Sequence, residues 1–203
     1  MKKIILTISA FIILLNVSAQ TDKLAGPRVG FTIISAGPIA DFIKTKDLER
    51  LTDDAAEFGE FGTAFMTQYG WQWETRFADG YDVTGLVEWV FMVGGLDQGL
   101  FLPSVSSLIG LRTSSNLEFA LGPNLSLSGI GGVIAVGYNF KVGEINLPVN
   151  IAFRPGIDKI RDRDIQTITT DANGNTETSY NRVEEPYNTG SLISLIVGFN
   201  LGD

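Results

Sequence analysis

Residues 131–142 read Gly-Gly-Val-Ile-Ala-Val-Gly-Tyr-Asn-Phe-Lys-Val. Every second residue from Ile134 to Val142 is apolar, whereas the alternate positions carry small or polar side chains apart from Val133. Because a β-strand turns successive side chains to opposite faces, this segment predicts a strand with one apolar face and one small or polar face. Such a strand occurs in any half-buried sheet, so the fold class can be inferred only from how often the pattern recurs along the chain.

The same alternation recurs along the chain and predicts eight strands, at residues 28–35, 65–77, 83–93, 100–112, 117–127, 131–142, 145–154 and 191–201. Most of these segments approach or exceed the roughly 9–11 residues that a tilted strand needs to cross a membrane. Strands of soluble proteins average about 5–6 residues. We therefore predict an all-β chain that forms an eight-stranded antiparallel up-and-down transmembrane β-barrel.

The connections between the predicted strands differ in length, and only residues 36–64 and 155–190 form long ones. In an up-and-down barrel the first and seventh connections emerge at one end, while the second, fourth and sixth emerge at the other. Outer-membrane barrels have short periplasmic turns and longer external loops. The two long connections are therefore predicted to be extracellular. Residues 38–43 and the charged run to Asp54 favour one or two helical turns, and the turn signal Asp-Ala-Asn-Gly-Asn at 171–175 favours a hairpin extension of the last long connection.

The first nineteen residues have the features of a secretion signal. Lys2 and Lys3 precede an apolar stretch at residues 4–15, and Val-Ser-Ala at 17–19 offers the small residues that signal peptidase reads before Gln20. The alternative is an uncleaved anchor, but the apolar stretch is shorter than the roughly 20 residues that a spanning helix needs. We predict a signal peptide at 1–19 and a barrel domain at 20–203.

The predicted inward faces carry charges of both signs. Eight strands enclose a space that side chains just fill, so an open pore is not expected. An unpaired buried ion costs several kcal/mol, which favours a paired structural network over a gate or a proton path. We predict that Gln68, Gln72 and Asn150 join a lumen network formed by Arg28, Glu74, Arg76, Glu88, Arg112, Glu118 and Arg154.

Aromatic residues gather on the outward faces of two neighbouring predicted strands. Tryptophan and tyrosine rings are typical of the girdles at membrane interfaces, where an amphipathic ring lies at headgroup depth. The alternative is the core of a soluble barrel, but that would require an apolar inward face. The predicted girdle residues are Tyr69, Trp71, Trp73, Phe77 and Trp89, with Phe91 beside them and Tyr81 at the periplasmic rim.

The chain contains no histidine and no cysteine, which excludes a Ser-His-Asp triad, His-ligated zinc, thiolate metal sites and disulfides. We expect no enzyme activity and no cofactor. The net charge of −8 argues against nucleic acid as a partner. An acidic loop segment, 158–164, is interleaved with Lys159, Arg161 and Arg163, which favours a self-paired loop over a calcium site. Those arginines could also pair with lipopolysaccharide phosphates.

From about Arg28 onward the chain resembles the small eight-stranded outer-membrane β-barrels of the OmpA/OmpX kind, in the porin-like superfamily. The resemblance rests on the secretion signal, the alternating segments, the loop parity and the strand-like C-terminus at 191–203. It implies a monomer in the outer membrane, in contact with lipid and lipopolysaccharide. Its implied role is structural, or surface interaction with an extracellular partner through loops 36–64 and 155–190. The alternatives are a carrier or transporter of a small hydrophobic ligand and a secreted soluble β-barrel binding protein.

Overall fold

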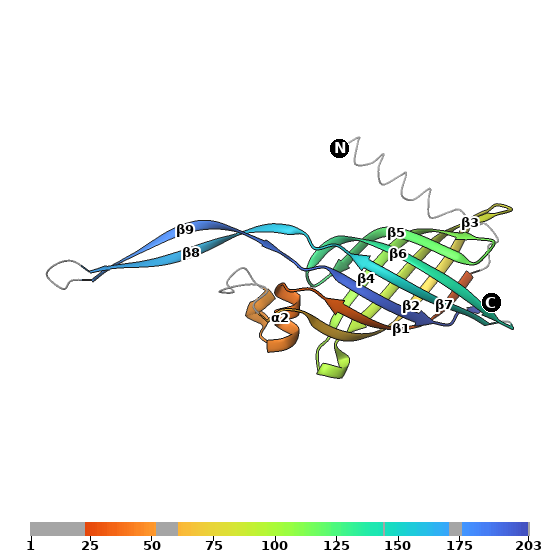
Figure 1. The fold of residues 1–203 in the computed structure, drawn as a ribbon, viewed down its shortest axis with the longest axis horizontal. Helices are drawn as coiled ribbons and strands as arrows, with labels where there is room; N and C mark the ends of the chain where they lie inside the picture. Colours follow the sequence, from red (N-terminus) through yellow and green to blue (C-terminus); the bar gives the residue numbers. More distant parts are fainter. Residues whose placement is uncertain (1–22, 52–60, 144, 171–175, 203) are drawn as a thin grey trace, which may run out of the picture.

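The computed structural model describes residues 23–51, 61–143, 145–170 and 176–202. The chain is drawn in Figure 1 from red at the N-terminus to blue at the C-terminus. The predicted signal peptide at 1–19 and the predicted turn at 171–175 lie outside these residues. The described part is all-β apart from one short α-helix and two single-turn 3₁₀ segments, and none of its helices is long and apolar enough to cross a membrane.

Eight strands close into an antiparallel barrel in which neighbours along the chain are neighbours around the ring. The pairing of the last of these strands with the first closes the ring, with Arg28 opposite Gly198 and Ile34 opposite Leu192. The prediction of an eight-stranded antiparallel barrel is confirmed. In ring order the strands are β1 (Lys23–Ile34), β2 (Ala64–Asp79), β3 (Val83–Gly94), β4 (Leu102–Thr113), β5 (Leu117–Ser126), β6 (Gly129–Val142), β7 (Ile145–Arg154) and β10 (Leu192–Gly198).

The two ends of the barrel differ, as the loop lengths predict. One end, named the turn end, carries the short β2–β3, β4–β5 and β6–β7 connections, and the other, named the loop end, carries both long connections (Figure 1). The last long connection contains β8 (Asp158–Thr170) and β9 (Thr176–Asn188), which pair antiparallel along their whole length and project beyond the barrel. The predicted hairpin extension is therefore confirmed in its two strands.

Side chains alternate between the two faces of the barrel wall as the opening segment predicts. Ile134 and Val136 of β6 are each 48% exposed on the outside, whereas Gly137 and Asn139, which follow them along the strand, are buried inside. On the inner face, Gly137 leaves room for the side chain of its cross-strand partner on the adjacent strand. A Cβ atom at Gly137 would lie only 1.6 Å from Oδ1 of Asn150 on β7. The apolar face of this strand therefore lies outside the barrel.

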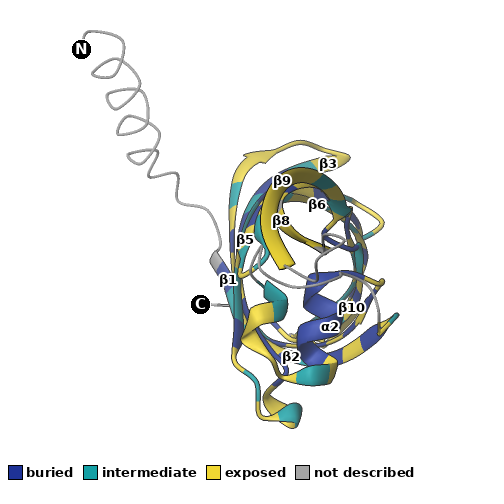
Figure 2. Ribbon diagram, turned by 90° about the vertical axis from the view of Figure 1, so that its left-hand side faces the viewer, coloured by how far each residue is buried: buried dark blue, intermediate teal, exposed yellow. Residues whose placement is uncertain are grey.

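A helix closes the loop end. α2 (Pro38–Thr45) has proline in its first turn and buries its apolar residues Ile39, Phe42 and Ile43. They pack with residues at the barrel rim, namely Ile34, Ala64, Met66 and Leu102, in a hydrophobic cluster. Viewed from the loop end, α2 lies within the ring of strands (Figure 2). The predicted helical turns at 38–43 are therefore confirmed. The 3₁₀ segments η1 (Leu48–Leu51) and η2 (Leu96–Gln98) lie in the first and third connections.

The chain returns to the barrel wall at its C-terminus. β11 (Leu201–Gly202) pairs with Leu24 and Ala25 of β1, and so extends the seam between the first and last strands. An isolated bridge joins Asn200 to Asn146, with the backbone N–H of Asn200 donating to the carbonyl of Asn146 at 2.8 Å. The two ends of the described chain therefore meet at the turn end of the barrel.

Candidate functional site

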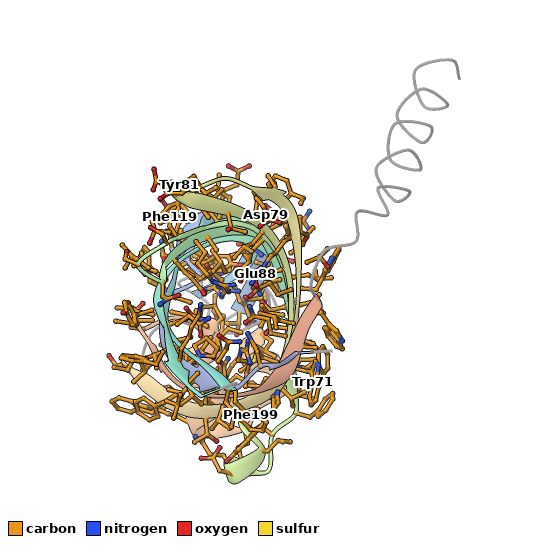
Figure 3. The ribbon with its side chains drawn as sticks, turned by 90° about the vertical axis from the view of Figure 1, so that its right-hand side faces the viewer. Trp71, Asp79, Tyr81, Glu88, Phe119 and Phe199 are labelled. Atoms are coloured by element: carbon orange, nitrogen blue, oxygen red, sulfur yellow. The ribbon has the colours of Figure 1, made fainter. Side chains whose placement is uncertain are left out.

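The barrel interior contains a buried group of five charged residues in the half nearer the turn end. Each of five neighbouring strands, β1 to β5, contributes one of these residues, and the acids lie on β2, β3 and β5. All five are at most 7% exposed, and Figure 3 shows Glu88 inside the ring while Trp71, Phe119 and Phe199 point outward. We name this group the charge cluster; it consists of Arg28, Glu74, Glu88, Arg112 and Glu118.

Arg112 on β4 joins two carboxylates within the charge cluster. Its Nη1 and Nη2 donate to the two carboxylate oxygens of Glu74 at 2.7 and 2.5 Å, and its Nε donates to Glu118 at 2.5 Å. Glu118 is the cross-strand partner of Arg112 on β5, whereas Glu74 reaches Arg112 across β3. A bidentate guanidinium–carboxylate pair is among the stronger hydrogen-bonded arrangements in proteins. Arg112 is therefore the principal cation of the cluster.

Arg28 on β1 connects the charge cluster to the seam of the barrel. Its Nε donates to Gln72 at 2.9 Å and its Nη2 donates to Oδ1 of Asn200 at 2.5 Å. Its Nη1 donates to the carbonyl of Pro27 at 3.0 Å. The amide of Gln72 in turn donates to Glu88 at 3.1 Å. Asn200 was not predicted in this network, although the alternation that places Ser194 inward places Asn200 inward as well.

The charge cluster contains three carboxylates and two guanidiniums. Glu74 and Glu118 both accept hydrogen bonds from Arg112, whereas Glu88 accepts one from the neutral amide of Gln72. Glu88 and Glu74 are also direct cross-strand partners, so two carboxyl groups face each other on β2 and β3. Of the three carboxyl groups in the charge cluster, that of Glu88 therefore contributes least to ion pairing with the arginines.

We expect Glu88→Gln to change the free energy of unfolding by less than about 1 kcal/mol, because glutamine keeps the side-chain volume and a partner for Gln72. The matched variant Glu74→Gln loses a charge-assisted bidentate pair with Arg112, and we expect it to cost about 1.5–3 kcal/mol. Urea unfolding of the two variants in detergent micelles measures the difference. An equal loss in both would contradict this division of roles.

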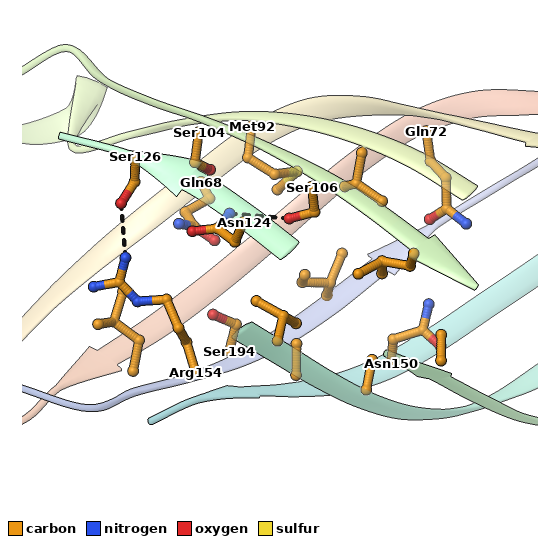
Figure 4. Close-up of a pocket in the computed structure, with 18 of the residues that line it drawn as sticks. Gln68, Gln72, Met92, Ser104, Ser106, Asn124, Ser126, Asn150, Arg154 and Ser194 are labelled. Carbon is orange, nitrogen blue, oxygen red and sulfur yellow. Dashed lines mark hydrogen bonds between the residues drawn. The ribbon is translucent and has the colours of Figure 1, made fainter. Parts of the chain in front are cut away.

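The interior is only partly filled by side chains. Between the charge cluster and α2 lies a cavity of about 120 Å³, which contacts Ile39 of the helix at one end and Glu88 and Glu118 at the other. Gln68 and Asn150, predicted to join the charge network, line this cavity (Figure 4). Most of its wall is apolar or small, including Met66, Val90, Met92, Leu108, Val133, Ala135, Ala152 and Ile196.

The two remaining predicted lumen residues are Arg76 and Arg154, which lie at different ends of the barrel. Arg76 is the next inward residue of β2 beyond Glu74 and is partly buried. Arg154 ends β7 at the loop end, is 8% exposed, and lines the cavity. Its Nη1 donates to Oγ of Ser126 at 2.7 Å (Figure 4). The prediction of one network for all seven residues therefore requires correction at Arg154, because β7 carries it to the opposite end of the lumen.

All the predicted girdle residues lie on the outside of one wall, formed by β2 and β3. Trp73 and Trp89 are cross-strand partners, and the rings of Trp71 and Trp73 are 6.5 Å apart. The ring of Phe77 lies over Gly85, where a Cβ atom would be 2.8 Å from it. Tyr81 at the turn end is 99% exposed. Other exposed aromatic residues continue around the barrel and were missed as girdle candidates, namely Phe31, Phe65, Phe101, Phe119, Tyr138, Phe140, Phe153 and Phe199.

The charged residues at the base of the projecting hairpin pair with one another. Arg161 on β8 donates to Glu185 on β9 at 2.7 Å, and Arg182 donates to Asp164 at 3.3 Å. Within the described residues there is no group of three or more acidic side chains arranged to hold a metal ion. These pairs agree with a self-paired hairpin.

No protein-family model matches the chain, and no curated protein matches it in sequence. The described residues define a class of protein by geometry: a closed eight-stranded antiparallel β-barrel with an exposed apolar outer face, a buried charge cluster and a helix-capped cavity. Function is therefore argued from this arrangement.

Proposed function

We propose that this protein is an integral outer-membrane β-barrel that presents its loop end to the cell exterior. The observation that carries the proposal is the outer surface of the barrel, where all eight strands expose large apolar side chains at alternate positions. We name this surface the apolar belt; it includes Val29, Phe31, Tyr69, Trp71, Trp89, Phe91, Val105, Ile109, Phe119, Leu121, Ile134, Val136, Ile151, Phe153, Leu195 and Val197.

The distribution of polarity is the reverse of that in a water-soluble barrel. Arg28, Glu74 and Arg112 are buried, whereas Ile109 is 63% exposed and Leu121 is 50% exposed. Soluble monomers rarely expose continuous apolar patches larger than a few hundred Å². Membrane barrels place apolar residues toward lipid and polar residues toward the lumen. A closed barrel also leaves no unpaired strand edge in the hydrocarbon region, as the bilayer requires.

The closed interior favours a role at the surface rather than a role as an open channel. The charge cluster occupies one half of the lumen, and α2 covers the loop end. The long connections, with α2 in the first and the β8–β9 hairpin in the last, then supply the external surface. We propose that they contact lipopolysaccharide or an extracellular partner, and that the barrel works as a monomer of the OmpA/OmpX kind.

Single cysteines test both insertion and orientation, because the native chain has no cysteine. Ile168 on β8 is 61% exposed at the loop side and Tyr81 is 99% exposed at the turn end. In intact Gram-negative cells, a membrane-impermeant maleimide should label Ile168→Cys at least tenfold more than Tyr81→Cys. After the outer membrane is permeabilised, both should be labelled equally.

Fractionation provides the control for this labelling. Both variants should remain in the membrane fraction after extraction with urea, and their folded bands should shift in gel mobility on boiling. Labelling of Tyr81→Cys alone in intact cells would reverse the proposed orientation. Recovery of the protein in the soluble fraction without detergent would contradict insertion itself.

Carriage of a small hydrophobic ligand is a second candidate function. The cavity of about 120 Å³ inside the barrel favours it, because the wall is mostly apolar. A purely structural barrel does not need such a space. This candidate requires a ligand that fits the cavity and its polar groups.

A further inference from the structure

Among the described residues, Arg154 is a buried cation without an anionic partner. The residue is 8% exposed, and within the described residues its guanidinium makes one hydrogen bond, from Nη1 to the hydroxyl of Ser126 at 2.7 Å. The Nε atom is buried and has no hydrogen-bond partner within the described chain. A buried guanidinium that lacks both a carboxylate and a full set of acceptors is costly, since ionised groups in a protein interior need pairing.

Two arginines of the charge cluster, Arg28 and Arg112, are better supplied with acceptors than Arg154. Arg112 donates to two carboxylates, and Arg28 donates to two side-chain oxygens and to backbone carbonyls. Arg154 faces the cavity instead, beside Ser126 and opposite Asn124 and Ser106, which hydrogen bond to each other at 3.0 Å (Figure 4). The guanidinium of Arg154 therefore has N–H groups at the cavity wall that donate to no described residue.

The cavity has the character of a site for an amphiphile. Its wall next to Arg154 is polar, and the middle of the wall is formed by Val90, Leu108, Val133 and Ile196. Its volume of about 120 Å³ approaches the roughly 150 Å³ of an apolar cavity known to hold benzene, so a chain of about six carbons is of suitable size. Glu88 and Glu118 line the far end and would repel an anion there. An anionic head is therefore favoured only at the Arg154 end.

The Arg154 end of the cavity lies close to the loop end of the barrel. A second hollow of about 170 Å³ lies at the loop end between α2 and the base of the β8–β9 hairpin. Ile39, Leu127 and Ser128 line both the hollow and the cavity. The hollow and the cavity therefore adjoin each other at the loop end.

We propose that the cavity binds a small carboxylate with a short apolar tail, with the carboxylate on the guanidinium of Arg154 and the tail between the apolar walls. Arg154 supplies the charge-assisted hydrogen bonds, and the tail replaces empty volume with van der Waals contact. This inference concerns the barrel interior alone, and it stands or fails independently of insertion into a membrane.

Titration calorimetry of the full chain in a non-ionic detergent tests the proposal with three probes. Hexanoate carries head and tail, hexanol carries the tail alone, and acetate carries the head alone. We expect saturable binding of hexanoate that is at least tenfold tighter than that of either partial probe. Absence of saturable hexanoate binding, or equal binding of hexanol, would overturn the proposal.

Variants locate the binding within the barrel. Arg154→Gln should weaken hexanoate binding by about tenfold or more, since it removes the charge-assisted bonds but can still donate to Ser126. Ala135→Leu places extra carbon atoms in the cavity and should abolish binding. The control Lys141→Gln makes the same charge change at an exposed site on β6 and should bind as the native protein does.

The mobility shift on boiling verifies that each variant is folded. Unchanged binding in folded Arg154→Gln or in folded Ala135→Leu would overturn the proposed position of the ligand. If either variant does not fold, the comparison of the three probes on the native chain still decides between a carboxylate site and no site.

Discussion

Arg112→Leu is expected to lower the free energy of unfolding by about 3–5 kcal/mol, the largest effect of any single substitution inside this barrel. The guanidinium of Arg112 donates to both oxygens of Glu74 and to one oxygen of Glu118. Its removal leaves two carboxylates buried without their cation, next to a third at Glu88. Breaking one partner of a buried ion pair costs far more than the net contribution of the pair.

Urea unfolding of the refolded protein in detergent or in lipid vesicles measures this loss. The triple variant in which Arg112, Glu74 and Glu118 are all replaced by leucine should recover part of it, because no buried charge is left unpaired. The control is Arg182→Leu, which breaks the exposed ion pair with Asp164 on the hairpin and should cost less than about 1 kcal/mol. Equal losses in Arg112→Leu and Arg182→Leu would show that the interior pairing does not stabilise the barrel.

The second large effect is expected on the outer surface. Leu121 lies in the middle of β5, is 50% exposed, and has apolar cross-strand neighbours in Ile109 and Ile134. If the apolar belt faces lipid, Leu121→Arg should cost about 2–4 kcal/mol, because an arginine near the bilayer midplane loses its hydration. The matched control is Ile168→Arg on the hairpin, where the native isoleucine is 61% exposed.

Unfolding of the two variants in lipid vesicles, together with their yield in the membrane fraction, measures the contrast. We expect a strong loss for Leu121→Arg and a change within about 0.5 kcal/mol for Ile168→Arg, as is usual for substitutions at a hydrated surface. A soluble barrel would have water at both sites. Equal, small effects in both variants would therefore contradict the proposed membrane insertion.

The alternation of side chains predicts most of the barrel because both faces of the wall are specified in each strand. The observed strand bounds differ from the predicted ones where other residue types interrupt that alternation. β1 begins at Lys23 rather than at 28, because the pattern is hidden by Gly26 and Pro27. Gly26 is needed there, since a Cβ atom would lie 1.8 Å from the carbonyl oxygen of Phe199, which directly follows β10. Sequence periodicity carries no information about such a close backbone approach.

The interior charges could be predicted from their inward positions, but their partners could not. Glu74 and Arg112 lie on β2 and β4, so their pairing depends on how side chains from non-adjacent strands meet across the curved lumen. The separation of Arg154 has another cause: this residue is the last of β7, beside the long connection, whereas Arg112 and Glu118 flank a short connection at the turn end. The cavity beside Arg154 is the volume that side chains leave unfilled, and this depends on the shape of the whole barrel.

The seam between β1 and β10 also limits when the barrel can be completed. Arg28 near the start of the described chain hydrogen bonds to Asn200 near its end, across 172 positions of sequence. Closing so long a segment carries a high entropic cost, which must be met before the contact forms. β1 therefore has one unpaired edge until β10 is available to pair with it. Completion of the ring must be one of the final steps of assembly, and until then both open edges need protection from pairing with other chains.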